Sequence, residues 1–377
     1  MKQILLFFFI STLFAQQTGE CGTDCIWTFF EAGGKLTISG SGKIDDYNDK
    51  SPTYKQYVEK ITSLSIGNEI KEIGSHAFEE FTKIIQIEFG TAITKIGEYA
   101  FNGCSKVKNA MFSGSVTEIG NNAFSNCKSM TMAFLGFGLK SLSKSIFENC
   151  TSLKVYILQQ NIERIEERAF YGCSQFSMIT FTKSLQYIGK SAFEQTGLVS
   201  LDLIAITIDE NAFRNCISLR QIFVRDVQTI GNNAFSNNPS LEHVILDSET
   251  QTIGKEAFYN CSKLKDFIYY GVSQPKCEEN ALMEITEVTV DSDYHFDKFC
   301  TSKPTVMGTV ESSTKSFSAG AIATIIIIIL LLLIIIIGLL AFILYSKFKE
   351  EKKFEYEFIK FKESESQQVN DDNLQLE

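Results

Sequence analysis

The sequence predicts a solenoid of about ten stacked coils, built on a parallel β-sheet and followed by one membrane-spanning helix. Two observations support this fold class. A phrase of nine residues recurs at nearly constant spacing through the middle of the chain, and an uncharged apolar stretch follows near the C-terminus. One coil of this length cannot bury its apolar face alone, so stacked coils are needed to form a continuous core.

The recurring phrase is Ile-Gly-x-x-Ala-Phe-x-x-Cys, which is complete at residues 96–104, 119–127 and 253–261. The spacing of its apolar residues predicts one short helical or 3₁₀ turn in each coil. Successive phenylalanines are 23, 23, 23, 23, 23, 20, 22 and 23 residues apart, and the changes in length predict a surface turn before the Ile-Gly. The phenylalanines are Phe78, Phe101, Phe124, Phe147, Phe170, Phe193, Phe213, Phe235 and Phe258.

A second pattern, upstream of each phrase, predicts the strands. Apolar residues stand at positions i, i+3 and i+5, as in Leu153, Tyr156 and Leu158. The last two alternate with variable residues, as in a short strand that turns one face to the core. Position i+4 then points outward, and the i+4 residues of successive coils are expected to line up as a column.

Large apolar residues fill this outward column in six of ten coils, although a solvated sheet face should be polar. Two interpretations remain open. Ile and Phe suit strands whichever way they face, and a contiguous exposed apolar strip also marks an interaction site. The predicted ligand-binding strip consists of Met111, Phe134, Ile157, Phe223, Ile245 and Ile268.

The two ends of the chain predict membrane insertion. Residues 1–15 combine one lysine, an apolar run and a small residue, as in a secretory signal peptide. Residues 319–345 lack any charge and are long enough to span a bilayer, and four lysines follow soon after. This charge asymmetry places the C-terminus in the cytoplasm and predicts a single-pass type I protein of the plasma membrane with an extracellular ectodomain.

The sequence therefore divides into seven expected segments. These are the signal peptide (1–15), an N-terminal cap module (16–60), the solenoid (61–270), a C-terminal cap (271–300), a Ser/Thr-rich stalk (301–318), the transmembrane helix (319–345) and a cytoplasmic tail (346–377).

The repeats resemble leucine-rich repeat proteins of the BspA-like surface type. The resemblance rests on the phrase at period 23 and on the stretch from Cys21 to Gly42, which is similar to the opening module of that family. It covers residues 20–300 and implies a leucine-rich repeat solenoid, exposed at the cell surface and used for adhesion and recognition. The membrane helix with its tail is similar to the protist branch of the family. Leu142-Ser143 and Ile208-Asp209 depart from the Ile-Gly pattern.

Composition disfavours catalysis and nucleic-acid binding. The net charge is −10 and the pI is about 5.1, whereas nucleic-acid binders present a basic face. The three histidines, His76, His243 and His295, lack metal-pair spacing, and no motif places a nucleophile beside a base. We therefore expect no enzyme activity, no cofactor and no metal.

The ten cysteines fall into two groups. Six occupy the repeat position, where a buried thiol can serve as a small hydrophobe. The other four flank the repeats, and in a secreted protein each flanking pair could close an end cap with a disulfide. The flanking pairs are Cys21 with Cys25 and Cys277 with Cys300.

Two acceptor sequons begin at Asn149 and Asn260. Each asparagine is either exposed and glycosylated at a turn, or buried as a cap for backbone groups. Both interpretations remain open at this stage.

The predicted function is adhesion to, or recognition of, cells or macromolecules by the extracellular solenoid. One alternative is an endocytic or uptake receptor, because Tyr356 and Ile359 form a Tyr-x-x-apolar motif of the kind that adaptor proteins read. Another is a structural coat protein whose solenoids pack side by side. The expected partners are a protein or cell-surface ligand outside, the membrane, and possible adaptor proteins at the tail, with no nucleic acid.

Overall fold

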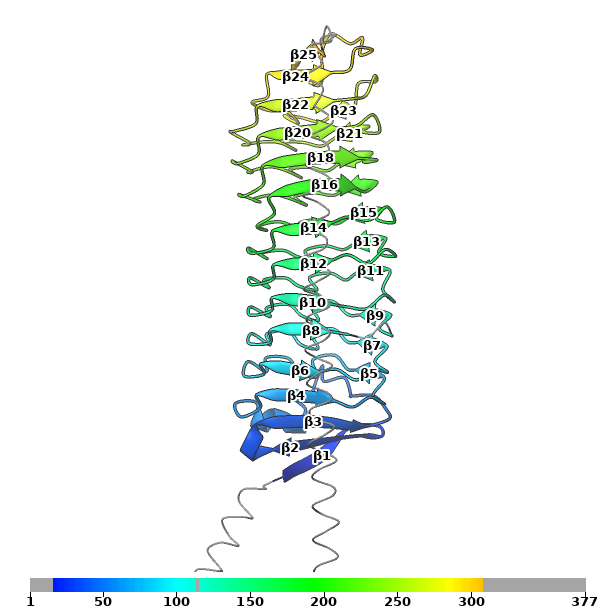
Figure 1. Ribbon diagram of the computed structural model, residues 1–377, viewed down its shortest axis with the longest axis vertical. Helices are drawn as coiled ribbons and strands as arrows, with labels where there is room; N and C mark the ends of the chain where they lie inside the picture. Colours follow the sequence, from blue (N-terminus) through cyan, green and yellow to red (C-terminus); the bar gives the residue numbers. More distant parts are fainter. Residues whose placement is uncertain (1–15, 113–114, 308–377) are drawn as a thin grey trace, which may run out of the picture. The chain divides into compact units, whose positions relative to one another are not determined.

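The computed structural model describes residues 16–112 and 115–307, which form a column of stacked coils (Figure 1). Each coil places one strand in a main sheet, turns, adds a two-residue strand to a second sheet, and returns through a run of turns. Ten such two-residue strands follow one another along the chain. The predicted parallel solenoid of about ten coils is confirmed.

The N-terminal module is antiparallel and covers the first coil. It comprises β1 (Gln16–Gly22), β2 (Cys25–Phe30), the 3₁₀ turn η1 (Glu31–Gly33), β3 (Lys35–Gly40) and the 3₁₀ turn η2 (Thr53–Tyr57). Its Trp27 is buried and donates a hydrogen bond from Nε1 to Thr53 Oγ1 at 2.8 Å. Tyr54 stacks on Phe78 of the first coil, with ring centroids 5.6 Å apart. The module thereby shields the open end of the core from water.

The main sheet is built from parallel strands that pair in register from coil to coil, and it is interrupted twice. No ladder pair of the described residues joins β6 to β8 or β14 to β16. The last two strands extend the sheet beyond residue 270. Its strands are β4 (Ser63–Ile66), β6 (Gln86–Glu88), β8 (Asn109–Met111), β10 (Met132–Phe134), β12 (Val155–Ile157), β14 (Met178–Thr180), β16 (Ser200–Ile204), β18 (Gln221–Arg225), β20 (His243–Leu246), β22 (Asp266–Tyr269), β24 (Glu287–Val290) and β25 (Lys303–Val306).

The second sheet consists of two-residue strands, each ending on the first residue of the repeat phrase, which is Ile in eight coils and Leu142 and Cys277 in the other two. It forms two parallel parts, of three and seven strands. The strands are β5 (Glu72–Ile73), β7 (Lys95–Ile96), β9 (Glu118–Ile119), β11 (Ser141–Leu142), β13 (Arg164–Ile165), β15 (Tyr187–Ile188), β17 (Thr207–Ile208), β19 (Thr229–Ile230), β21 (Thr252–Ile253) and β23 (Lys276–Cys277).

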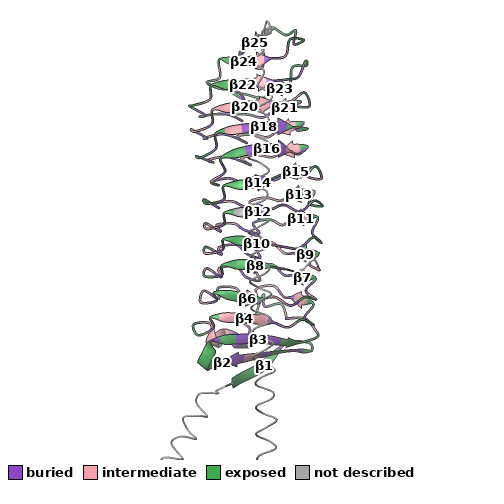
Figure 2. Ribbon diagram, in the orientation of Figure 1, coloured by how far each residue is buried: buried purple, intermediate pink, exposed green. Residues whose placement is uncertain are grey.

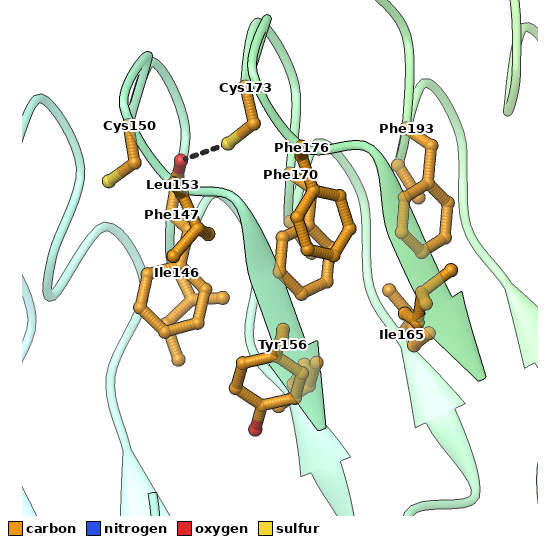
Figure 3. Close-up of a cluster of buried hydrophobic side chains, with 14 of the residues drawn as sticks. Ile146, Phe147, Cys150, Leu153, Tyr156, Ile165, Phe170, Cys173, Phe176 and Phe193 are labelled. Atoms are coloured by element: carbon orange, nitrogen blue, oxygen red, sulfur yellow. Dashed lines mark hydrogen bonds between the residues drawn. The ribbon is translucent and has the colours of Figure 1, made fainter. Parts of the chain in front are cut away.

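The phenylalanines of the repeat phrase form one stack along the core. All nine are buried, and neighbouring ring centroids lie 5.1 to 6.0 Å apart. Figure 3 shows three of them, Phe147, Phe170 and Phe193, with Tyr156 and Phe176 packed beside them. Such aromatic pairs contribute about 0.5–1.5 kcal/mol beyond the burial of their area. The constant period of the phrase therefore reflects a need to keep each ring over the ring of the preceding coil.

The predicted helical or 3₁₀ turn in each coil is wrong, because the described coils contain turns but no helix after the Ile-Gly. Two residues per coil, four positions apart, have left-handed φ, such as His76 at 59° and Glu80 at 63°. These reversals point alternate amides along the stack, so that Phe78 N–H donates to Ala100 O of the next coil at 2.8 Å. Amides of these turns are therefore satisfied partly by the next coil and partly within their own coil, as Asn102 N–H is by Tyr99 O at 3.0 Å.

The second left-handed position explains a sequence feature that the repeat analysis missed. Asn and Gly enter the left-handed region more readily than other residues. They fill this position in seven of ten coils, namely at Gly103, Asn126, Asn149, Gly172, Asn215, Asn237 and Asn260.

Candidate binding face

The register of the main sheet aligns the outward residues that the repeat predicted. Met111 pairs with Phe134, and Phe223 pairs with Ile245, which in turn pairs with Ile268. We call these five residues the outer column. Met111 is 50% exposed and Phe223 37% exposed, and the other three are half-buried.

The sixth predicted position, Ile157, lies in β12 in register with Thr180. Its side chain lies outside what the structure describes. The break between β14 and β16 divides the outer column into two parts. The middle sheet is the part formed by β8, β10, β12 and β14. The C-terminal sheet is the part formed by β16, β18, β20, β22, β24 and β25.

The middle sheet presents methionines on its outer face. Met132 and Met178 are 51% and 59% exposed and stand in the column next to Met111. Phe137 follows β10, is 67% exposed, and touches Phe134 edge-on at 5.3 Å between centroids. Figure 2 shows β8, β10 and β14 in the colour of exposed residues. Large apolar side chains therefore meet solvent over neighbouring coils.

Lysines flank the middle sheet without any acidic residue among them. The segments that run from the cysteine position through each strand, at 104–112, 127–137, 150–161 and 173–184, contain five lysines and no Asp or Glu. All five are exposed, and none forms an ion pair with a described residue. They are Lys106, Lys108, Lys128, Lys154 and Lys183.

The C-terminal sheet pairs its outward charges between coils. Arg225 Nε donates to Asp202 Oδ1 at 2.8 Å, in a bidentate pair. His243 Nδ1 lies 2.7 Å from Asp266 Oδ2. The Arg225–Asp202 pair borders a hollow of about 590 Å³ whose lining also includes Phe223, Ile245, Tyr270 and Asp247. This part of the face combines apolar surface with charges of both signs.

A second hollow opens where the main sheet is interrupted. Six residues separate Thr180 from β15, whereas only four separate Asp202, at the same position one coil on, from β17. A hollow of about 670 Å³ lies here, lined by residues of three successive coils. We call it the break pocket. Its lining includes Tyr156, Met178, Ile179, Phe181, Thr182, Lys183 and Ile204.

The break pocket has apolar walls and a polar rim without acidic residues. Thr182 Oγ1 is buried and has no hydrogen-bond partner among the described residues. Lys183, at the next position, is exposed. The pocket therefore combines an apolar floor with a positive charge at its rim.

The six repeat cysteines are buried thiols, and each is also a hydrogen-bond donor. Cys173 Sγ–H donates to Phe147 O of the preceding coil at 3.1 Å (Figure 3). Burial raises the pKa of Cys104 to about 12 and that of Cys216 to about 11. A thiol held protonated and away from solvent is not a nucleophile, so this column belongs to the interior and not to a site. The same bond is made by Cys104, Cys127, Cys150, Cys216 and Cys261.

Both flanking cysteine pairs are disulfides in the structure. Cys21 is joined to Cys25 in the N-terminal module, and Cys277 to Cys300 at the other end of the solenoid.

The two sequon asparagines occupy the left-handed turn position and form side-chain ladders with the preceding coil. Asn149 is half-buried, and its Nδ2 donates to Asn126 Oδ1 at 3.4 Å. Asn260 is exposed, and its Nδ2 donates to Asn237 Oδ1 at 2.9 Å. A glycan on Asn260 would meet less crowding than one on Asn149.

The remaining predicted positions either lie apart or fall outside the described residues. His76 contacts Glu79 through Nδ1 and Oε2 at 2.6 Å, far along the chain from His243. The part of the chain that the structure describes contains no group of three side chains able to hold a metal ion. It also contains no helix that is long and apolar enough to span a bilayer. Residues 1–15, the 319–345 segment, Tyr356 and Ile359 lie outside it.

Stacked parallel coils of about 23 residues with one main-sheet strand each define a leucine-rich repeat protein. The chain belongs to the BspA-type family. The model for the BspA type leucine-rich repeat region matches six copies, over residues 52–157, 140–265 and 204–288.

Several solved structures of bacterial leucine-rich repeat proteins are similar to the chain. A leucine-rich repeat protein from Bacteroides ovatus is 20% identical over 75% of this chain and 98% of its own, with a TM-score of 0.43. One from Eubacterium ventriosum is 19% identical over 74% and 80%, with a TM-score of 0.48. A leucine-rich cell surface protein from Faecalibacterium prausnitzii is 20% identical over 78% and 96%, with a TM-score of 0.43. No curated protein matches the chain.

Proposed function

We propose that this leucine-rich repeat protein is a type I surface protein whose extracellular solenoid adheres to cells or macromolecules through the outer face of its main sheet. The proposal assigns it binding and no catalytic step. Its main support is the outer column. Met111, Phe134, Phe223 and Ile245 lie on an outward sheet face, where polar residues are expected.

The size of the face agrees with a macromolecular partner. From β4 to β25 twelve strands lie side by side, and at about 4.8 Å per strand this face is about 50 Å long. A stable protein interface needs about 800 Å² on each partner, or 20–30 residues. Two columns of outward residues over this length can supply such an area.

Two hollows make parts of the face concave. The hollow at Phe223 and Ile245 and the break pocket each have a volume in the range of about 300–1,000 Å³ that ligand pockets show. Interface anchors are large side chains that insert into pockets of this kind. The same face therefore offers flat apolar surface and places for anchoring side chains.

The proposal is tested with residues 16–307, a segment that contains the whole core from Cys21 to Phe299 and both disulfides. Its binding to intact cells and to immobilised matrix proteins is compared with that of a variant in which the outer column is made polar. The variant carries Met111→Ser, Phe134→Thr, Phe223→Thr and Ile245→Thr. The proposal expects the variant to lose binding while its circular dichroism stays unchanged.

A matched control removes exposed apolar side chains that lie off the outer column. Ile206→Ser, Ile217→Ser and Tyr259→Ser together should leave binding intact. Equal binding by the parent and the outer-column variant would overturn the proposed site. Absence of binding by the parent to any cell or matrix would overturn adhesion itself.

Membrane anchoring rests on residues 1–15 and 319–345 and has its own test. The full chain, tagged after residue 16 and expressed in a eukaryotic cell, should be stained on intact cells and shed by external protease. Loss of surface staining after deletion of 319–345 completes the test, and unchanged surface retention would contradict the anchor.

A further inference from the structure

The middle sheet differs from the rest of the face in charge and in shape, and this difference points to one kind of partner. We infer that β8–β14, together with the break pocket, binds an acidic polypeptide segment that carries apolar side chains. This rests on the proposed function, because it names the partner chemistry for the first part of the outer column.

Charge gives the first argument. The chain has a net charge of −10, yet the four segments around the middle sheet contain five lysines and no acidic residue. On the turn side of the same coils lysines have partners, as Lys144 has in Glu167 at 2.8 Å and Lys190 in Glu210 at 2.9 Å. Lys108 and Lys154, at the start of β8 and β12, have none among the described residues. Complementary charge raises association rates and excludes basic partners.

The methionines give the second argument. Met111, Met132 and Met178 belong to the same segments as these lysines and are each half or more exposed. A polyanion without apolar groups would neutralise the lysines and leave this apolar surface in water. Methionine side chains are unbranched and polarisable, so they can follow the shape of apolar groups from a partner. The surface therefore favours a ligand that combines carboxylates with apolar side chains.

The break pocket gives the third argument. Its floor includes Tyr156, Ile179 and Phe181, and at about 670 Å³ it is large enough for an aromatic side chain. Lys183 lies at the rim to receive a carboxylate. An aromatic side chain beside an acidic one fits both features.

The first experiment measures binding of residues 16–307 to four polymers of similar length. These are a random copolymer of glutamate and tyrosine, polyglutamate, a random copolymer of lysine and tyrosine, and heparin. The glutamate–tyrosine copolymer should bind about tenfold or more tightly than polyglutamate or heparin, because only it uses the apolar surface. The lysine–tyrosine copolymer should not bind. Raising NaCl from about 0.05 M to about 0.5 M should weaken the complex, as expected for exposed charges.

Two variants locate the site. Lys108→Glu, Lys154→Glu and Lys183→Glu together should abolish binding of the glutamate–tyrosine copolymer. Met111→Ser, Met132→Ser and Met178→Ser together should reduce it to the level of polyglutamate. A control with the same change in charge, Lys71→Glu, Lys263→Glu and Lys298→Glu, should bind as the parent does. All of these residues are exposed, and thermal melts confirm that each variant is folded.

The outcomes separate this inference from the proposed function. Equal binding to heparin and the glutamate–tyrosine copolymer, with no effect of the methionine changes, would show that charge alone acts and would overturn the inference. Binding of the lysine–tyrosine copolymer would overturn it as well. If the ectodomain adheres to cells through the outer column but ignores every acidic polymer, the inference fails and the proposed function stands.

Discussion

The middle sheet and the C-terminal sheet belong to one solenoid. Their buried residues are alike, whereas the residues on their outer faces differ. Inside, the same phenylalanine stack runs through both, from Phe147 and Phe170 to Phe213 and Phe235. Outside, the middle sheet shows methionines and lysines that form no ion pair with a described residue, whereas the C-terminal sheet shows charge pairs such as Arg225 with Asp202. Stacking fixes the interior of each coil and leaves its outer face free to take on a particular partner.

The cysteine position shows how strict the interior is. In the middle sheet every coil has Cys there, whereas two of the C-terminal coils have Thr196 and Asn238 instead and two keep Cys216 and Cys261. The substitutes are also hydrogen-bond donors: Asn238 Nδ2 donates to Phe213 O at 3.0 Å and to Phe235 O at 2.8 Å, and Thr196 Oγ1 donates to Phe193 O at 2.9 Å. From Cys104 to Cys261 the position therefore holds a donor for a buried carbonyl, whereas Phe81 of the first coil fills it without one.

The largest expected effect tests the common interior. Phe170→Ala in the middle sheet and Phe213→Ala in the C-terminal sheet should each destabilise the fold by about 3–5 kcal/mol, because each leaves a cavity in the stack. Urea unfolding of residues 16–307, followed by circular dichroism, measures both. A much smaller loss for Phe213→Ala would show that the two parts do not share one core.

The next largest effect concerns the cysteine position of the repeat, where a hydrogen-bond donor faces buried carbonyls. Asn238→Leu should lose about 1–3 kcal/mol, since two buried carbonyls lose their side-chain donor. Asn238→Cys should be close to neutral, because the thiol donates and because it removes Oδ1, which has no partner among the described residues. Urea midpoints of the two variants compare them directly. Equal losses would mean that volume, and not hydrogen bonding, governs this position.

Alkaline pH should weaken both parts through their thiols. Burial raises the pKa of Cys104 and Cys261 to about 12 and of Cys216 to about 11, whereas an exposed thiol titrates near 9. On raising the pH, the unfolded chain therefore loses these protons before the folded chain does. The contribution of the buried thiols to the free energy of unfolding is complete below about pH 9 and falls as pH rises toward 12.

At pH 10 the loss is about 1 kcal/mol for each such thiol. Urea midpoints between pH 7 and pH 10.5 measure it. Cys216→Thr, which copies the residue of the preceding coil, should show a smaller pH dependence than the parent. An identical dependence would assign the alkaline loss to other groups, such as Tyr47, whose pKa burial raises to about 12.

The smallest expected effect concerns the charges of the C-terminal sheet. Asp202 and Arg225 are each more than half exposed, so the pair is screened by water. Asp202→Asn should change the free energy of unfolding by less than about 1 kcal/mol. A larger loss in the same urea assay would show that outward pairs hold the coils together, against the division between inside and outside drawn above.

The sequence was sufficient for the solenoid and for the alignment of its strands, because a period of 23 places Met111 beside Phe134 whatever the turns do. It was insufficient for the turns themselves. Apolar residues three and four apart fit a helical turn and a left-handed turn equally well, and it is the structure's left-handed φ angles and the hydrogen bond from Phe78 to the next coil that distinguish them. The Asn and Gly before each cysteine were the available signal.

The break pocket could not be predicted either. The shortened spacing between Phe193 and Phe213 was visible, and it predicted a surface turn. The loop before β17 is two residues shorter than the loop before β15. Whether this difference leaves a hollow between the two coils depends on the conformation of both loops, which the spacing does not specify. The absence of acidic residues around Lys108 and Lys154 was readable from the sequence once the strand segments were compared as a set.

The direction of the hydrogen bonds has a mechanical consequence. Because the bonds between coils run along the stack, tension applied to its two ends loads them one after another, and coils should peel away singly. Each peeled coil of 23 residues releases about 80 Å of extended chain. The Cys277–Cys300 bond withholds one such length at the C-terminal end. A solenoid of this kind would lengthen under load in steps of about one coil each, which limits the force that it transmits between its two ends.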